Sequence, residues 1–217
     1  MRKKAFLFDL NGTMVDDMQY HIQAWHKILN DLGADISLAR MKEECYGKNE
    51  ELLERIFPGR FNEAEIKQMS FDKESQYQQH FKPYLKLLPG LDVFLKTAFD
   101  QQISMAIGSA AIMFNIDFVL DNCQIRSYFQ ALVSAESVKE SKPDPETFLT
   151  CQQLLKVQPQ DCIVFEDSVK GVESAKRAGM KTVVITTLHE PQEFAAFDNI
   201  LFFIKDYKDE RLQTLFN

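Results

Sequence analysis

The chain has 217 residues, enough for one domain or for a core domain with a smaller insert. Hydrophobic residues make up 45% of the chain, which excludes a disordered protein. The net charge of −7, without a long basic tract, disfavours nucleic acid and anionic membranes as partners. We also expect no transmembrane segment, because no apolar run is long enough to span a bilayer.

The cysteines and the N-terminus bear on the compartment. The four thiols lack the spacing of a metal clip or a redox dithiol, which is typical of a reduced cytoplasm. The first apolar run is too short for a signal peptide. We therefore expect a cytoplasmic protein. The cysteines are Cys45, Cys123, Cys151 and Cys162.

The first 82 residues predict one strand followed only by helices. Residues 4–10, KAFLFDL, are apolar and aromatic, as in a strand buried on both faces, and Gly12 and Thr13 end this run. Apolar residues recur at helical spacing over 17–32. Three further helices are predicted, at 38–46, 49–57 and 62–82.

From residue 90 onward, strands alternate with helices. Gly90 opens a helix, strands are predicted at 103–107, 131–133, 162–165, 181–185 and 199–203, and helices at 110–121, 144–155, 169–178 and 207–215. This alternation predicts a parallel sheet covered on both faces. The whole pattern predicts an α/β core with an all-helical insert after its first strand.

Polar residues follow four of the predicted strands. Because ligands bind at the carboxyl ends of parallel strands, these residues should converge on one crevice. They are Asp9, Asn11, Gly12 and Thr13; then Gly108, Ser109 and Ala110; then Lys142; then Glu166, Asp167 and Ser168.

These residue types fit phosphoryl transfer. A carboxylate such as Asp9 can attack phosphorus if a cation neutralises both anions. Mg²⁺ prefers oxygen ligands, which Asp9, Asp167 and the carbonyl of Asn11 can supply. Ser109 and Lys142 can contact the phosphoryl oxygens, and the amides of Leu10, Asn11, Gly12 and Ala110 can cradle them.

Some of these assignments have structural alternatives. Glu166 can orient a metal-bound water, or it can be a purely structural acid. Ser109 can cap a helix as well as bind phosphate. Lys48, a cation between two predicted helices, can bind substrate or can be a solvated side chain.

The set DLNGT, GSA, KPDPETF and EDS resembles, in order and spacing, the four motifs of the haloacid dehalogenase superfamily. The β-phosphoglucomutase and phosphoglycolate phosphatase group is the most similar branch, and the resemblance covers nearly the whole chain. It implies a Rossmann-like core (residues 1–14 and 87–217), a helical cap domain (residues 15–86), and an aspartyl-phosphate on Asp9. It also implies a Mg²⁺ site that includes Asp9, Asn11, Glu166 and Asp167.

Asn11 departs from the family pattern, which has a second Asp here. In the family, that Asp protonates the leaving oxygen and then activates the attacking water or hydroxyl. An amide cannot do so at neutral pH, and this type of catalysis is worth about 10²–10⁴-fold. Asn11 is either an engineered substitution or the natural residue of a slow or altered enzyme. If it is natural, a non-catalytic sugar-phosphate binder is an alternative.

The cap residues bear on the choice between phosphatase and mutase. His21 matches the mutase pattern, and Lys48 is a cation that could hold a distal phosphate. However, Glu50 stands where a mutase Arg would align. Residues 111–113, AIM, replace the polar residues of that group. We therefore expect a monomer that hydrolyses a small phosphorylated metabolite such as a sugar phosphate, with β-phosphoglucomutase activity as the alternative.

Overall fold

The computed structural model describes residues 4–217. They form two compact units: a core unit, residues 4–16 with Lys86–Asn217, and a cap unit, Asp17–Leu85. Residues 1–3 of the predicted core domain lie outside the described residues. Within residues 4–217, none of the helices has the length and apolar character needed to cross a membrane.

The core unit is built on one parallel sheet of six strands, in the order β3-β2-β1-β4-β5-β6. This confirms the predicted α/β fold. The strands are β1 (Ala5–Phe8), β2 (Ser104–Gly108), β3 (Ala131–Val133), β4 (Cys162–Glu166), β5 (Lys181–Ile185) and β6 (Ile200–Ile204).

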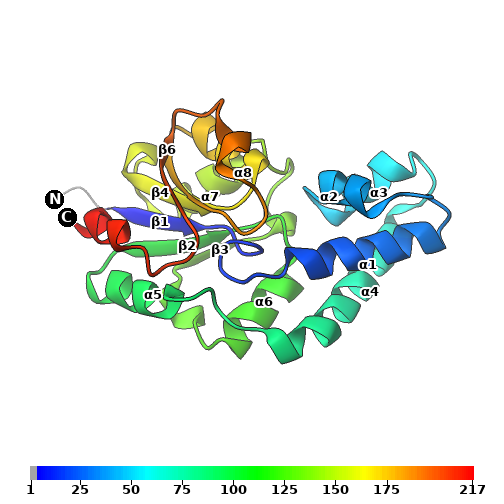
Figure 1. The fold of residues 1–217 in the computed structure, drawn as a ribbon, viewed down its shortest axis with the longest axis horizontal. Helices are drawn as coiled ribbons and strands as arrows, with labels where there is room; N and C mark the ends of the chain where they lie inside the picture. The colour runs from blue at the N-terminus through cyan, green and yellow to red at the C-terminus, as the bar shows by residue number, and fades with distance from the viewer. Residues whose placement is uncertain (1–3) are drawn as a thin grey trace. The chain divides into compact units, whose positions relative to one another are not determined.

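Helices cover both faces of this sheet, as Figure 1 shows, with α5 and α6 on one side and α7 and α8 on the other. Their bounds are α5 (Leu91–Asp100), α6 (Met113–Asn122), α7 (Glu146–Leu155) and α8 (Val169–Arg177). All four residues of β1 are fully buried. Leu7 packs in the cluster that contains Phe148 of α7, whereas Phe6 stacks on Phe94 of α5 at 5.4 Å. The sequence of β1 is therefore continuously apolar because both of its faces are covered.

Two helix predictions need their bounds corrected. The short helix predicted at 207–215 forms as a 3₁₀ helix, η6 (Glu210–Phe216), and Tyr207 precedes it. The helix predicted from residue 110 begins only at Met113, whose amide donates to the Glu136 carboxylate. The other 3₁₀ helices are η1 (Lys82–Tyr84), η2 (Arg126–Tyr128), η3 (Ala135–Ser137), η4 (Pro159–Asp161) and η5 (Pro191–Phe194).

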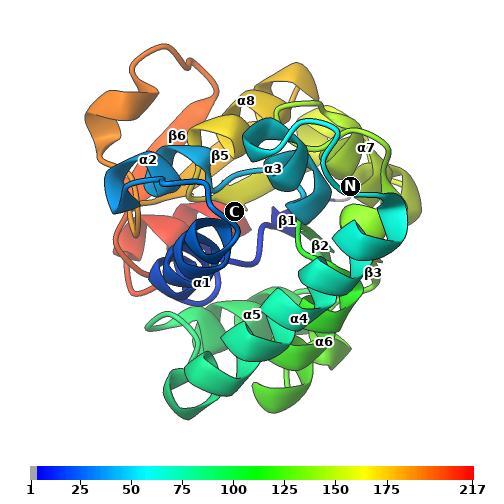
Figure 2. The same cartoon turned by 90° about the vertical axis from the view of Figure 1, so that its right-hand side faces the viewer.

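The cap unit contains four α-helices, labelled in Figure 2. They are α1 (Met18–Asp31), α2 (Leu38–Glu44), α3 (Asn49–Ile56) and α4 (Glu63–Phe81). Helix α1 packs against α2 and α4, and α3 packs against α4. Helix α4 begins with a capping box in which Asn62 and Glu65 satisfy each other's backbone amides.

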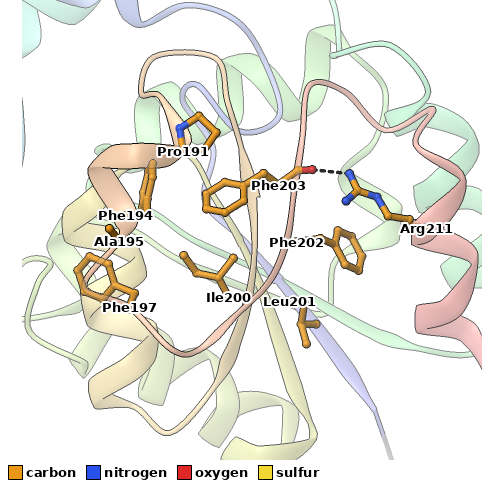
Figure 3. A pocket seen from close by; sticks show the side chains of 9 residues that line it. All are labelled: Pro191, Phe194, Ala195, Phe197, Ile200, Leu201, Phe202, Phe203 and Arg211. Carbon is orange, nitrogen blue, oxygen red and sulfur yellow. Dashed lines mark hydrogen bonds between the residues drawn. The ribbon is translucent and has the colours of Figure 1, made fainter.

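A pocket of about 470 Å³ lies at the β6 edge of the sheet and contains none of the predicted site residues (Figure 3). Arg211 donates from Nη2 to the Phe203 carbonyl at 2.6 Å, which occupies one acceptor of this free edge. The pocket is lined by Pro191, Phe194, Ala195, Phe197, Ile200, Leu201, Phe202, Phe203 and Arg211.

Candidate active site

Asp9 stands at the carboxyl end of the central strand β1. Its amide donates to the Phe165 carbonyl of β4 at 3.0 Å, so the sheet fixes its backbone. Its Oδ1 accepts from Lys142 Nζ at 2.6 Å, and the residue is only 8% exposed. A buried carboxylate is costly unless it is paired. The fold thus keeps a paired carboxylate at the strand end where a ligand would bind.

The turn after Asp9 is held by its own backbone and by two side chains. Gly12 has φ of +72°, a conformation that favours glycine, and its amide donates to the Val15 carbonyl at 2.8 Å. The predicted role of the Gly12 amide as a phosphate donor is therefore not supported, because this amide already has a backbone partner. Thr187 Oγ1 donates to the Gly12 carbonyl at 2.6 Å, and the Tyr207 hydroxyl donates to the Thr13 carbonyl at 3.2 Å.

Asp167 shares this site with Asp9. Thr13 Oγ1 donates to Asp167 Oδ1 at 3.4 Å. Burial, together with the negative charges of Glu166 and Asp9, raises the pKa of Asp167 well above its ordinary value. Burial and the charges of Asp9 and Asp167 likewise raise the pKa of Tyr207. The two aspartates therefore repel each other in a site from which water is largely excluded.

Lys142 is held between two carboxylates. Its Nζ donates to Asp9 Oδ1 at 2.6 Å and to Glu166 Oε1 at 2.7 Å, and it lies 4.6 Å from the centre of the Phe148 ring. Burial alone lowers the pKa of Lys142, but Asp9 and Glu166 raise it above its ordinary value. The ammonium group therefore stays charged at neutral pH and fits an anionic group bound next to Asp9.

Ser109 follows β2, the strand that pairs with β1 and places Ile107 opposite Phe8. Its amide donates to the Val133 carbonyl at 3.0 Å, and its Oγ accepts from the Ala111 amide at 3.2 Å. That bond does not commit the hydroxyl proton, which can be donated to a phosphate oxygen. The alternative role of Ser109 as a helix cap is wrong, because Ile112 is the N-cap of α6.

The donor set fits Mg²⁺. Among residues 4–217 no three His, Cys, Asp or Glu side chains are grouped as ligands of one ion. Mg²⁺ needs only one or two protein carboxylates, since waters and substrate phosphates complete its shell. Asp9 and Asp167 supply such a pair, and their mutual repulsion is what a divalent cation would relieve. Both oxygens of Glu166 are already hydrogen-bonded, to Lys142 and to Ser168.

Two residues at this site were missed in the sequence. Thr187 and Tyr207 come from the chain beyond β5 and fix the turn after Asp9 through its carbonyls. Each lies just beyond the end of a predicted strand, at 181–185 and at 199–203. That position is the signal that could have identified both of them.

His21 belongs to a buried polar network inside the cap unit. Lys73 Nζ lies 2.6 Å from His21 Nδ1, and the imidazole stacks on Tyr77 with ring centres 3.9 Å apart. Nε2 lies 3.5 Å from Asp17 Oδ2, an oxygen that also accepts from the Tyr77 hydroxyl.

Lys48 is the N-cap residue of α3 and is only 6% exposed. Its amide donates to Glu51, and its Nζ lies 3.8 Å from Glu50 Oε1. The structure thus describes His21 and Lys48 within the cap unit, and their contact with substrate stays a prediction.

The lowered pKa of Glu74 predicts that the cap unit loses stability in acid. Burial alone raises its pKa, but Lys73, His21 and Asn49 lower it, to about 2 from its ordinary 4.5. Such a group stabilises the fold above pH 4.5, and this contribution is lost as the pH falls through about 2. Glu74→Gln should therefore destabilise the cap helices at neutral pH, and its difference in stability from the chain with Glu74 should shrink in acid.

Hydrogen exchange of the α1 and α4 amides, corrected for the intrinsic rate at each pH, measures this difference. Glu43→Gln is the matched control, because the Glu43 side chain is 70% exposed. An equal effect of Glu74→Gln at neutral and acid pH would contradict the assignment.

The class of protein is defined by its parallel sheet, by the acid at the end of the central strand and by the lysine paired with that acid. Residues 6–185 match the family described as haloacid dehalogenase-like hydrolase, so the chain belongs to that family. This confirms the family resemblance of the four motifs.

Individual relatives include both a mutase and a phosphatase. The chain is 34% identical to β-phosphoglucomutase of Bacillus subtilis, over 83% of this chain and 82% of that protein. It is 29% identical to fructose-1-phosphate phosphatase of Escherichia coli, over 86% of this chain and 98% of that protein. The crystal structure of β-phosphoglucomutase from Clostridium difficile superposes with a TM-score of 0.85 at 27% identity, covering 100% and 98% of the two chains.

Proposed function

We propose that this protein transfers the phosphoryl group of a small phosphomonoester, such as a sugar phosphate, to Asp9 and then to water. The observation that carries the proposal is the buried Asp9 carboxylate, held by Lys142 at 2.6 Å beside Asp167. The relatives that hydrolyse or isomerise sugar phosphates support this choice of substrate class.

The reaction takes two displacements at phosphorus. A carboxylate oxygen of Asp9 forms a bond to phosphorus while the bond to the leaving oxygen breaks, and the leaving oxygen takes up a proton. Water then attacks the same phosphorus, the bond to Asp9 breaks, and phosphate is released. Lys142 neutralises charge on the phosphoryl oxygens, and the Ser109 hydroxyl donates to one of them.

Asn11 limits both displacements. The leaving oxygen needs a proton in the first step, and water must lose one in the second. The Asn11 amide exchanges neither proton at neutral pH, so we propose a slow enzyme in which solvent replaces the missing acid and base.

Mg²⁺ is the cofactor that fits this site, with Asp9, Asp167 and the Asn11 carbonyl as its proposed protein ligands. When bound, it neutralises the anionic carboxylates and phosphoryl group, so that the two can approach each other. Glu166 has both oxygens committed to other donors, so we propose that it acts on Lys142 rather than on the metal.

Mg²⁺ should stabilise the chain with Asn11 against heat, and Asp167→Asn should remove most of this effect. A concentration a hundredfold above the dissociation constant should raise Tm by about 5–10 °C. The pKa of Asp167 is raised, so this group costs stability as the pH rises above its ordinary value of 3.8, and Asp167→Asn should raise Tm at neutral pH when Mg²⁺ is absent.

Differential scanning calorimetry with and without Mg²⁺, at constant ionic strength, measures both shifts. If Asp167→Asn kept the full response to Mg²⁺, Asp167 would not be a ligand.

Hydrolysis is favoured over mutase action by charges near the predicted distal-phosphate positions. The Glu136 carboxylate accepts from the Met113 amide at 3.1 Å, which places an anion on the loop after Ser109. In the cap unit, Glu50 lies 3.8 Å from Lys48 Nζ, the proposed substitute cation. Each acid would repel a phosphate bound next to it. The 34% identical mutase keeps β-phosphoglucomutase activity as the second candidate.

A substrate panel tests the proposal directly. Fructose 1-phosphate, β-glucose 1-phosphate, glucose 6-phosphate and hexitol phosphates would be incubated with the Asn11→Asp variant and Mg²⁺. We expect release of inorganic phosphate from at least one of them. Conversion of β-glucose 1-phosphate to glucose 6-phosphate with a bisphosphate activator would establish the mutase instead. If a broad panel gave neither inorganic phosphate nor an isomerised sugar phosphate, phosphoryl transfer would be contradicted.

A further inference from the structure

The Glu166 carboxylate fills the space next to Gly171 where any other residue would begin its side chain. A Cβ on Gly171 would lie 1.8 Å from Glu166 Oε1, 1.9 Å from its Cδ and 2.4 Å from its Oε2. These separations are far below any non-bonded contact. Glu166 and a side chain at position 171 therefore cannot both occupy their places.

The backbone at Gly171 does not itself require glycine. Gly171 lies inside α8 and is not among the glycines with positive φ. In a helix interior, glycine is among the least favourable residues and alanine the most favourable. The space that the Glu166 carboxylate takes is therefore the structural reason for glycine here.

Glu166 reaches this space because donors hold it there. Its Oε2 accepts from the Ser168 amide at 2.8 Å and from Ser168 Oγ at 3.0 Å, at the N-terminus of α8. Ser168 Oγ also accepts from the Gly171 amide at 3.0 Å, which caps the helix. The other oxygen, Oε1, accepts from Lys142 Nζ at 2.7 Å. Glu166 thus ties the start of α8 to Lys142.

We propose that Gly171 is a positioning residue of the active site: it lets the Glu166 carboxylate lie against α8 and hold the Lys142 ammonium against Asp9. The proposal rests on the proposed function for what Lys142 then does, but not for the steric relation itself. A methyl group at position 171 would push the carboxylate away and break its bonds to Ser168 and Lys142. Lys142 would keep Asp9 and lose its second anchor.

A double-mutant cycle at positions 166 and 171 tests the steric relation without any assay of activity. With Glu166 in place, Gly171→Ala should lower Tm by about 5 °C or more, because buried charged hydrogen bonds are lost. In the Glu166→Ala background the obstacle is gone. There Gly171→Ala should raise Tm by about 2–4 °C through helix propensity alone.

The sign of the Tm change that Gly171→Ala causes in the Glu166→Ala background decides whether the steric relation holds. If Gly171→Ala lowers Tm equally in both backgrounds, the methyl group meets something other than Glu166 and the proposal is overturned. If Gly171→Ala alone does not fold but the double variant does, the proposal is supported. A double variant that fails to fold, when Glu166→Ala alone folds, overturns it.

Kinetics in the Asn11→Asp background separate positioning of Lys142 from metal binding by Glu166. Gly171→Ala should lower kcat about tenfold or more, while the Mg²⁺ concentration at half-maximal rate changes less than about twofold. Arg177→Ala, on the exposed face of the same helix, is the matched control and should leave kcat unchanged. A rate that recovers fully at high Mg²⁺ would make Glu166 a metal ligand and overturn its role through Lys142. If the panel shows no turnover, the proposed function fails while the Tm cycle still decides the steric relation.

Discussion

Replacing Asn11 with Asp is expected to raise kcat for phosphate release by about 10²–10⁴-fold. The substitution supplies a carboxyl group that can protonate the leaving oxygen and then take a proton from the attacking water. Asp9, the proposed nucleophile, is already paired with the charged Lys142, so on the proposed function proton transfer is the missing part. Steady-state phosphate release with saturating Mg²⁺, for the chain with Asn11 and for Asn11→Asp, measures the gain.

The matched control is Asn62→Asp, the same chemical change at the exposed N-cap of α4, where Asn and Asp cap equally well. It should leave the rate unchanged. A gain of less than about threefold for Asn11→Asp would show that this position carries no acid–base role. Equal and substantial turnover by the chain with Asn11 would lead to the same conclusion.

The second large effect is expected at Asp9, the proposed nucleophile. Asp9→Asn should lower kcat in the Asn11→Asp background by about 10⁴-fold or more, because no covalent intermediate can form. The amide keeps the shape of the carboxylate but not its charge, so the loss should fall on kcat rather than on folding. Phosphate release and far-UV circular dichroism, measured on the same preparation, separate the two effects.

Asp100→Asn is the control for this change, because Asp100 pairs with Lys96 on the exposed surface of α5. It should have full activity. Retention of more than about a hundredth of the rate by Asp9→Asn would mean that water attacks the substrate phosphorus directly. The phosphoaspartate route would then be wrong.

The strands and most helices follow from local patterns that packing reinforces. The continuous apolar run before Asp9 predicts a strand buried on both faces, and β1 is such a strand. The C-terminal turns were predicted only as a helix, and they form the 3₁₀ helix η6 rather than an α-helix. Asp209 is its N-cap and accepts from the Arg211 amide. Apolar spacing over so few residues does not distinguish a 3₁₀ helix from a short α-helix.

The sequence predicted only those site residues that directly follow a strand or the loop after it. Asp9, Lys142 and Asp167 follow predicted strands, and topology brings strand ends to one edge of a parallel sheet. The commitment of the Gly12 amide to Val15 could not be predicted, because it depends on the turn conformation. Nor could the place of Glu166, since two acids in sequence do not reveal which of them faces Lys142.

The measurement that tests the account most directly is chemical trapping of the phosphorylated residue. The Asn11→Asp variant would be mixed with a substrate from the panel, quenched within one turnover and treated with borohydride, which reduces an acyl phosphate to an alcohol. The account predicts that peptide mapping finds homoserine at position 9 only when substrate was present. Trapping at another carboxylate, or an unmodified Asp9 during rapid turnover, would contradict it.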